Sequence, residues 1–289
     1  MATDRPRFGP SGNSASFYAE GCKHSAEAPK WLHGKGLDAY EYSFGRGVNL
    51  SGATAAQIGA EAQKYGIAVS VHAPYYINFA SDNPEAREKS RNYLYASVQS
   101  AQALGASRVV FHPGSCAGRD RAEALRTALK ELEEAVRYLA DRDICTVTLC
   151  PETMGKLNQL GTVDEVLELC AVNPTVFRPA LDFGHINALG QGALKTREDY
   201  ERIFDRVEQA LGSRSARAAH IHFSKIEYGK SGEVRHLTFE DEAYGPEFLP
   251  LAHVMAERAM HPTVICESNE TMAEDALKMK AMYESAANL

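Results

Sequence analysis

The sequence predicts an α/β protein, a single (β/α)₈ TIM barrel that spans residues 1–289. Two observations predict this fold. Short apolar runs of strand length recur along the chain, and a longer helix-like stretch separates most neighbouring runs. Alternation of this kind is typical of a parallel sheet whose strands are buried on both faces. A length of 289 residues also agrees with one such barrel.

Eight strands are expected. The first two cover residues 7–10 and 37–44, and the other six begin near Val69, Arg108, Thr146, Arg178, Ala218 and Thr263. The expected helices cover residues 54–65, 84–104, 119–140, 162–170, 196–211, 246–260 and 272–287. Asn83 and Pro84 supply a cap and a first-turn proline to the second of them. Residues 227–244 form a loop rich in glycine and charge after the seventh strand, so we expect this loop to be functional.

Composition and charge limit the classes of function. The net charge of −7 argues against a protein that binds nucleic acid over its whole surface, but it does not exclude a local site to which metal ions add positive charge. The sequence has no apolar stretch of the roughly 20 residues that span a bilayer. Residues 1–7 lack the apolar core of a secretory signal. The six cysteines are scattered, as in a reduced protein, so we expect a cytoplasmic location and no membrane partner.

Metal-ligand residue types stand at the ends of the apolar runs. They are His72, His112, Glu152, Asp182, His185, His222 and Glu267, and His236 follows in the loop after the seventh strand. The carboxyl ends of all strands of a (β/α)₈ barrel meet on one face, so these side chains are expected to be neighbours. A single buried histidine is more often a hydrogen-bonded core residue than a ligand, but a series of such accidents is improbable. Imidazole and carboxylate together suit Zn²⁺, Mn²⁺ or Fe²⁺.

Several of these segments resemble endonuclease IV. The resemblance runs in chain order from about residue 70 to Glu267, and it rests on the segments His72–Asn78, Phe111–Ser115, Pro151–Thr153, Leu181–His185, Ile221–Phe223 and Arg235–His236. That family consists of zinc-dependent apurinic/apyrimidinic endonucleases with a TIM-barrel fold. The resemblance therefore implies the same fold, two or three Zn²⁺ ions per chain, and double-stranded DNA with abasic sites as the partner.

The resemblance also implies a role for each matching residue. His72 and His112 would bind a first zinc, and Glu152 would bridge it to a second, which Asp182, His222 and Glu267 would complete. His185 and His236 would bind a third zinc. Glu152 and Glu267 are the expected catalytic carboxylates, and Glu267 would orient the attacking water. Tyr75, Asn78 and Arg235 are the expected substrate-binding residues. Tyr75 matches an aromatic placed against DNA, and Asn78 matches an asparagine of the same loop. The charge of Arg235 suits contact with phosphate, although a solvated residue of a loop with mixed charges is an equally ordinary interpretation.

The chain departs from the family pattern at three places. The family has an aspartate two residues before the loop histidine, where this sequence has Val234; either Glu233 takes its place or the third site is weak or absent. Ser224 and Lys225 stand where the family has Asn-Asp, which changes the wall of the groove. The loop after the second strand does not match the DNA-penetrating loop, and Arg46 is its one candidate for a DNA contact.

Two functions follow as alternatives. The first is a monomeric DNA-repair phosphodiesterase that cleaves the backbone 5′ to an abasic site, leaves a 3′-hydroxyl end and also cleans 3′ ends. The second is a single-metal sugar isomerase or epimerase of the xylose-isomerase-like barrel type. The half-site Glu152, Asp182, His222 and Glu267 would suffice for the second. His72, His112, His185 and His236 exceed the needs of one metal, so they favour the phosphodiesterase.

Overall fold

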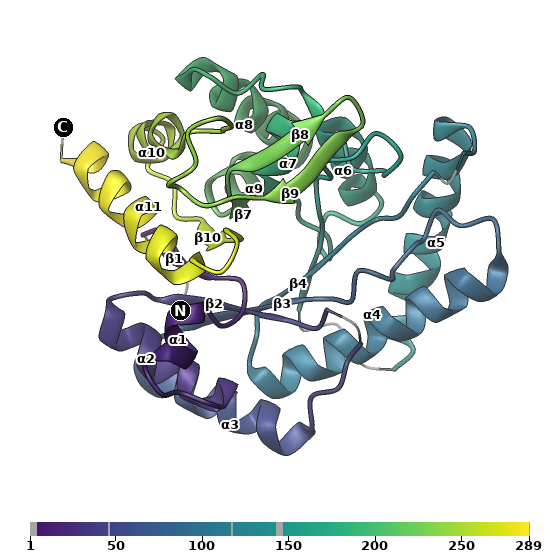
Figure 1. Ribbon diagram of the computed structural model, residues 1–289. Helices are drawn as coiled ribbons and strands as arrows, with labels where there is room; N and C mark the ends of the chain where they lie inside the picture. The colour runs from purple at the N-terminus through teal and green to yellow at the C-terminus, as the bar shows by residue number, and fades with distance from the viewer. Residues whose placement is uncertain (1–4, 46, 117, 143–146, 289) are drawn as a thin grey trace.

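The computed structural model contains the expected barrel of parallel strands (Figure 1). It describes residues 5–45, 47–116, 118–142 and 147–288. The barrel strands are β1 (Arg7–Pro10), β2 (Ala39–Ser43), β3 (Ala68–His72), β4 (Arg108–Phe111), β5 (Thr148–Pro151), β6 (Ala180–Asp182), β7 (His220–Phe223) and β10 (Thr263–Cys266). The prediction of the fold class is therefore confirmed. The expected start of the fifth strand, Thr146, lies outside the described residues.

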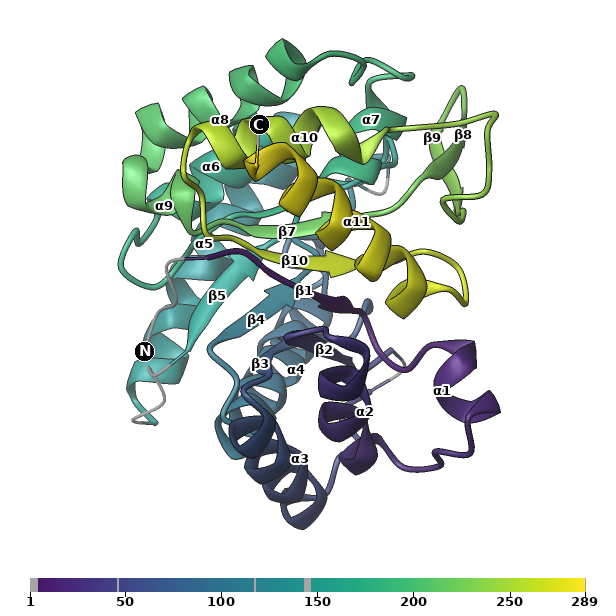
Figure 2. The ribbon, with the colours of Figure 1, turned by 90° about the vertical axis from the view of Figure 1, so that its left-hand side faces the viewer.

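The barrel consists of two four-stranded parallel sheets, in the orders β1-β10-β7-β6 and β2-β3-β4-β5. Isolated parallel bridges join the two sheets: Ser11 pairs with Glu41 at one seam, and Glu152 pairs with Ala180 at the other. All eight strands run in the same direction, so their carboxyl ends meet at one end of the barrel. In Figure 2 the arrows of β1 and β10 point toward the side on which strands β8 and β9 lie.

Helices surround this barrel (Figures 1 and 2). They are α1 (Ala15–Ala19), α2 (Ala28–Lys35), α3 (Gly52–Tyr65), α4 (Pro84–Leu104), α5 (Arg121–Ala140), α6 (Val163–Ala171), α7 (Phe183–Leu189), α8 (Arg197–Leu211), α9 (Ser213–Arg217), α10 (Phe248–Glu257) and α11 (Met272–Ala287), with a 3₁₀ turn at Ser25–Glu27. The Asn83 side chain accepts a hydrogen bond from the Glu85 amide and so caps α4, as predicted. No helix among the described residues is long and apolar enough to cross a membrane.

The segment after β7 differs from the expectation. It was predicted to be a loop, but it contains an antiparallel hairpin of β8 (Ile226–Gly229) and β9 (Gly232–His236). The register pairs Tyr228 with Glu233 and Glu227 with Arg235. Val234 is therefore an extra residue in β9, a β-bulge, and it changes which side chains of the strand share a face.

Candidate metal centre

Two sets of ligand atoms meet at Glu152, which directly follows β5 and is fully buried. Its Oε2 lies 3.1 Å from His72 Nε2 and 3.2 Å from His112 Nε2. Its Oε1 lies 2.9 Å from His222 Nδ1. One carboxylate therefore presents each of its oxygens to a different set of histidines, which is the arrangement that a carboxylate bridging two cations requires.

The second set completes a four-residue group. Glu152, Asp182, His222 and Glu267 each offer one ligand atom, and these atoms lie within 4.8 Å of one another. The first set, His72, His112 and Glu152, meets the same criterion. Asp182 Oδ2 is buried and has no hydrogen-bond partner among the described residues. His185 Nδ1 lies 3.3 Å from it, but that nitrogen donates to the carbonyl of Thr153. A cation is a partner that such an orphaned carboxylate oxygen would accept.

A third set lies between α7 and the hairpin. It consists of His185, Glu233 and His236, whose ligand atoms also lie within 4.8 Å of one another. Glu233 Oε2 is 3.4 Å from His185 Nε2, and Glu233 Oε1 is 4.0 Å from His236 Nε2. Val234 is 56% exposed. Of the two alternatives that the sequence left open, the structure favours the one in which Glu233 takes the place of the family's aspartate.

Most of the histidines are oriented by a group of the chain itself. His72 Nδ1 donates to the Ala73 carbonyl, and His185 Nδ1 donates to the Thr153 carbonyl. Ser224, which departs from the family pattern after β7, hydrogen-bonds His236 Nδ1 through its hydroxyl. In each ring the other nitrogen faces the ligand group. Anchoring one imidazole nitrogen in this way fixes the tautomer and the ring orientation of a metal ligand, so the residues present fit metal ions.

The charge of the centre also favours cations. Burial lowers the pKa of His72, but the Glu152 carboxylate and its acidic neighbours outweigh burial and raise the pKa to about 9. Burial and the nearby Glu267 and Glu152 raise the pKa of Asp182 to about 6, although His185 opposes them. The carboxylates therefore draw protons to the centre. Metal ions would supply that positive charge instead of protons.

Glu41 was missed by the sequence analysis. It lies on β2, fully buried, with Oε2 2.9 Å from His220 Nε2 and Oε1 2.9 Å from His222 Nε2. The Ser70 hydroxyl donates to it at 2.8 Å. Glu41 thus holds the side of the His222 ring that faces away from Glu152. An acidic residue within the otherwise uncharged run of residues 39–44 was the signal that could have revealed it. His220 contacts Glu41 through Nε2, and its Nδ1 lies 3.4 Å from Arg108 Nη1.

The expected substrate-binding residues lie in three different settings. Tyr75 and Tyr76 are about half exposed in the loop after β3, with ring centroids 4.5 Å apart. Asn78 Oδ1 accepts hydrogen bonds from the amides of Ala80 and Ser115, so it holds two loops together. Arg235 is exposed on β9 and pairs with Glu227 at 2.7 Å. Their roles toward a substrate stay predictions, and Arg46 lies outside the described residues.

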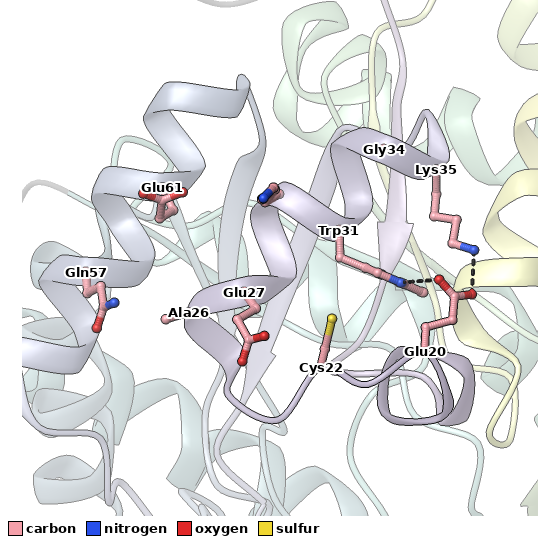
Figure 3. Close-up of a pocket in the computed structure, with 10 residues that line it drawn as sticks. Glu20, Cys22, Ala26, Glu27, Trp31, Gly34, Lys35, Gln57 and Glu61 are labelled. Atoms are coloured by element: carbon pink, nitrogen blue, oxygen red, sulfur yellow. Dashed lines mark hydrogen bonds and ion pairs between the residues drawn. The ribbon is translucent and has the colours of Figure 1, made fainter.

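A hollow between α2, α3 and the segment that follows α1 is separate from this centre (Figure 3). Its Glu20 carboxylate accepts from the Trp31 indole and pairs with Lys35. Two of its charged groups, Glu20 and Lys35, therefore satisfy each other at one edge of the hollow.

Histidines and carboxylates that could hold metal ions gather at the carboxyl ends of the barrel strands. This combination of fold and site is typical of metal-binding α/β-barrel enzymes. A model of the xylose isomerase-like TIM-barrel family matches residues 29–283. The chain therefore belongs to that family, and the family assignment made from the sequence is confirmed.

Individual relatives extend this assignment. An uncharacterized protein of Methanocaldococcus jannaschii is 32% identical over 252 residues, 86% of this chain and 88% of its own. A probable endonuclease 4 of Aquifex aeolicus is 33% identical over 167 residues, which is 56% of this chain and 57% of that relative. The match thus spans little more than half of the endonuclease 4 protein.

Solved structures agree on the fold. Endonuclease IV from Thermus thermophilus has a TM-score of 0.70 at 22% identity, covering 97% of this chain and all of its own. A D-tagatose 3-epimerase-like protein has a TM-score of 0.67 at 21% identity, covering 87% and 90%. Because both identities are low, these similarities show the barrel and do not choose between nuclease and epimerase.

Proposed function

We propose that this protein is a zinc-dependent DNA-repair phosphodiesterase that cleaves the backbone 5′ to abasic sites and leaves a 3′-hydroxyl end, with 3′-end cleaning by the same site. The observation that carries the proposal is Glu152, whose two oxygens face two different sets of ligands. A single-metal enzyme has no need of that arrangement. The presence of endonuclease 4 proteins among the relatives supports the same proposal.

In this proposal His72, His112 and Glu152 hold one zinc, Glu152, Asp182, His222 and Glu267 hold a second, and His185, Glu233 and His236 hold a third. Mn²⁺ or Fe²⁺ would fit the same donors. When bound, these ions lower the pKa of water and stabilise negative charge on phosphoryl oxygens and on the leaving 3′-oxygen. Hydrolysis then needs no protein nucleophile.

The residues of the chain bind, orient and move protons. Glu267 is the ligand-group carboxylate with the more accessible side chain, 17% exposed against 1% for Glu152. We therefore assign it to orient the attacking water and to accept its proton, while Glu152 holds the two ligand sets in place. Tyr75 would pack against the DNA at the abasic nucleotide, with Asn78 positioning its loop and Arg235 placed near a backbone phosphate. The chain would act as one domain of residues 1–289, a cytoplasmic monomer on the duplex.

The second candidate is a single-metal sugar isomerase or epimerase. The group Glu152, Asp182, His222 and Glu267 meets its needs. It leaves His72, His112, His185, Glu233 and His236 without a function. That surplus is the reason that we place it second.

The test joins metal content to incision. Protein purified without added metal is analysed by plasma mass spectrometry and incubated with a duplex that contains one abasic site. We expect two or three zinc ions per chain, and chelator-sensitive nicking that leaves a 3′-hydroxyl end. One manganese or cobalt ion per chain, with no nicking and with epimerisation of a ketose, would establish the second candidate instead.

A further inference from the structure

A cavity of about 820 Å³ lies at the end of the barrel opposite the ligand groups. Its lining includes the first residue of five strands: Arg7 of β1, Ala68 of β3, Arg108 of β4, Thr148 of β5 and Thr263 of β10. The ligand groups stand at the last residues of the strands or beyond them. In Figure 2 the arrows of β1 and β10 point away from this end. The cavity is therefore separate from the metal centre.

The charge of the cavity is opposite to that of the whole chain. Its lining contains the five arginines Arg5, Arg7, Arg108, Arg178 and Arg214, and it includes no aspartate or glutamate among the described residues. The chain as a whole carries a net charge of −7. A concave surface lined by one sign of charge concentrates ions of the opposite sign.

Three of these guanidinium groups have no carboxylate partner among the described residues. Arg5 pairs with Asp38 at 2.8 Å, but Arg108, Arg178 and Arg214 form no such pair. Arg108 donates from Nη2 to the Ala218 carbonyl at 2.7 Å, and its Nη1 lies 3.4 Å from His220 Nδ1. Burial lowers the pKa of Arg108, and the nearby Arg178 lowers it as well. Cations placed together in this way are stabilised by an anion between them.

The remaining lining fits a tetrahedral anion attached to a small molecule. Hydroxyl groups come from Ser107, Thr148 and Thr263, whereas the Thr175 and Ser215 hydroxyls of the same lining donate to Asn173 and to the Leu211 carbonyl. Guanidinium forks and hydroxyls together are the donors that bind phosphoryl oxygens. Ala62, Ile67 and Val69 add an apolar wall for the rest of a ligand. The volume lies within the roughly 300–1,000 Å³ of small-molecule sites.

We propose that this cavity binds the phosphoryl group of a small-molecule ligand, with Arg108, Arg178 and Arg214 as the groups that hold it. The site differs from the metal centre in place, charge and ligand. The proposal therefore does not depend on the phosphodiesterase proposal.

The test is a calorimetric titration of the purified full chain with inorganic phosphate at constant ionic strength. The double variant Arg178→Gln, Arg214→Gln removes two guanidinium groups of the lining, and that of Arg178 donates to the backbone carbonyls of Phe177 and Pro174. The matched control is Arg202→Gln, Arg206→Gln, which removes two arginines of α8 that pair with Asp199 and Asp164 away from the cavity. We expect the control to bind as the original protein does and the cavity variant to bind at least tenfold more weakly.

Two further sets of variants show where phosphate binds and whether the guanidinium groups are needed. Phosphate bound at the metal centre would be lost in His112→Ala and kept in the cavity variant, and that result would overturn the proposal. Equal phosphate binding in all variants, or no binding in the original protein, would overturn it as well. Circular dichroism checks folding. The pair Arg178→Lys, Arg214→Lys keeps the charge without the fork, so it should restore part of the affinity.

Discussion

The candidate ligands form two groups on different parts of the fold. The strand-end group consists of His72, His112, Glu152, Asp182, His222 and Glu267, and the hairpin group consists of His185, Glu233 and His236. The first uses side chains at or just beyond the ends of parallel barrel strands, with exposed side-chain fractions from 0% for His222 to 21% for His112. The second uses α7 and a two-stranded hairpin, and its His236 side chain is 27% exposed. Barrel strands are held by neighbours on both sides, whereas the hairpin strands pair mainly with each other. We therefore expect the first group to be the more rigid and the second to be the more easily lost.

The largest effect is expected at the strand-end group. His112→Ala removes a ligand of the proposed first zinc but no core contact, so the protein should fold and lose at least about 1,000-fold in incision rate, because metal ions supply several kcal/mol of charge stabilisation. Incision of an abasic duplex and zinc content are measured together. The control is His33→Ala on α2, an exposed histidine far from the centre in the chain. Full activity in His112→Ala would remove the first zinc from the proposal.

The hairpin group should respond more weakly. Glu233→Ala removes the carboxylate between His185 and His236, so we expect one metal ion fewer per chain and incision reduced by about 100-fold. Val234→Asp is the matched variant, and it should change neither value because Val234 is 56% exposed and Glu233 already supplies the carboxylate of the group. An increase in metal content or activity in Val234→Asp would show that Glu233 does not complete the third set.

A substitution of Glu41 tests whether this carboxylate holds the His222 ring of the strand-end group in position. Glu41→Gln keeps the shape of the side chain but removes the charge facing His222, so zinc affinity should fall by about 10- to 100-fold. Competition with a chelator measures that affinity directly. Activity should return when zinc is added in excess, which is the behaviour of a positioning residue. Lost activity that excess zinc does not restore would contradict this role.

The smallest effect is expected outside both groups. Tyr75→Ala should raise the KM for an abasic duplex about tenfold and leave zinc content unchanged, because stacking of a base on an aromatic ring contributes about 1–3 kcal/mol. Tyr18→Ala is the control, since Tyr18 has a similar exposure and belongs to α1. An unchanged KM in Tyr75→Ala would show that Tyr75 does not contribute to binding of the duplex.

The same contrast explains what the sequence could and could not predict. Strand-end ligands such as His72 and Glu152 were predictable because parallel strands bring their carboxyl ends together whatever the loops do. Glu233 was left as an alternative because its position depends on the bulge at Val234, and a one-residue insertion in a hairpin leaves no periodic signal. Glu41 was missed for another reason: it lies within a strand and not at its end, so the acid in the uncharged run was visible in the sequence but its contact with His222 was not.

The contact between the hairpin and the loop after β5 sets how robust the third ligand set is to mutation. The Glu233 amide donates to the Gly155 carbonyl at 2.8 Å. A Cβ on Gly155 would lie 2.8 Å from the Glu233 Cβ, and one on Gly232 would lie 2.0 Å from the Gly155 carbonyl oxygen. One added methyl group would push the hairpin away from His185. A glycine-to-alanine substitution at either position, which alters neither a ligand nor a charge, would therefore be enough to separate Glu233 from His185.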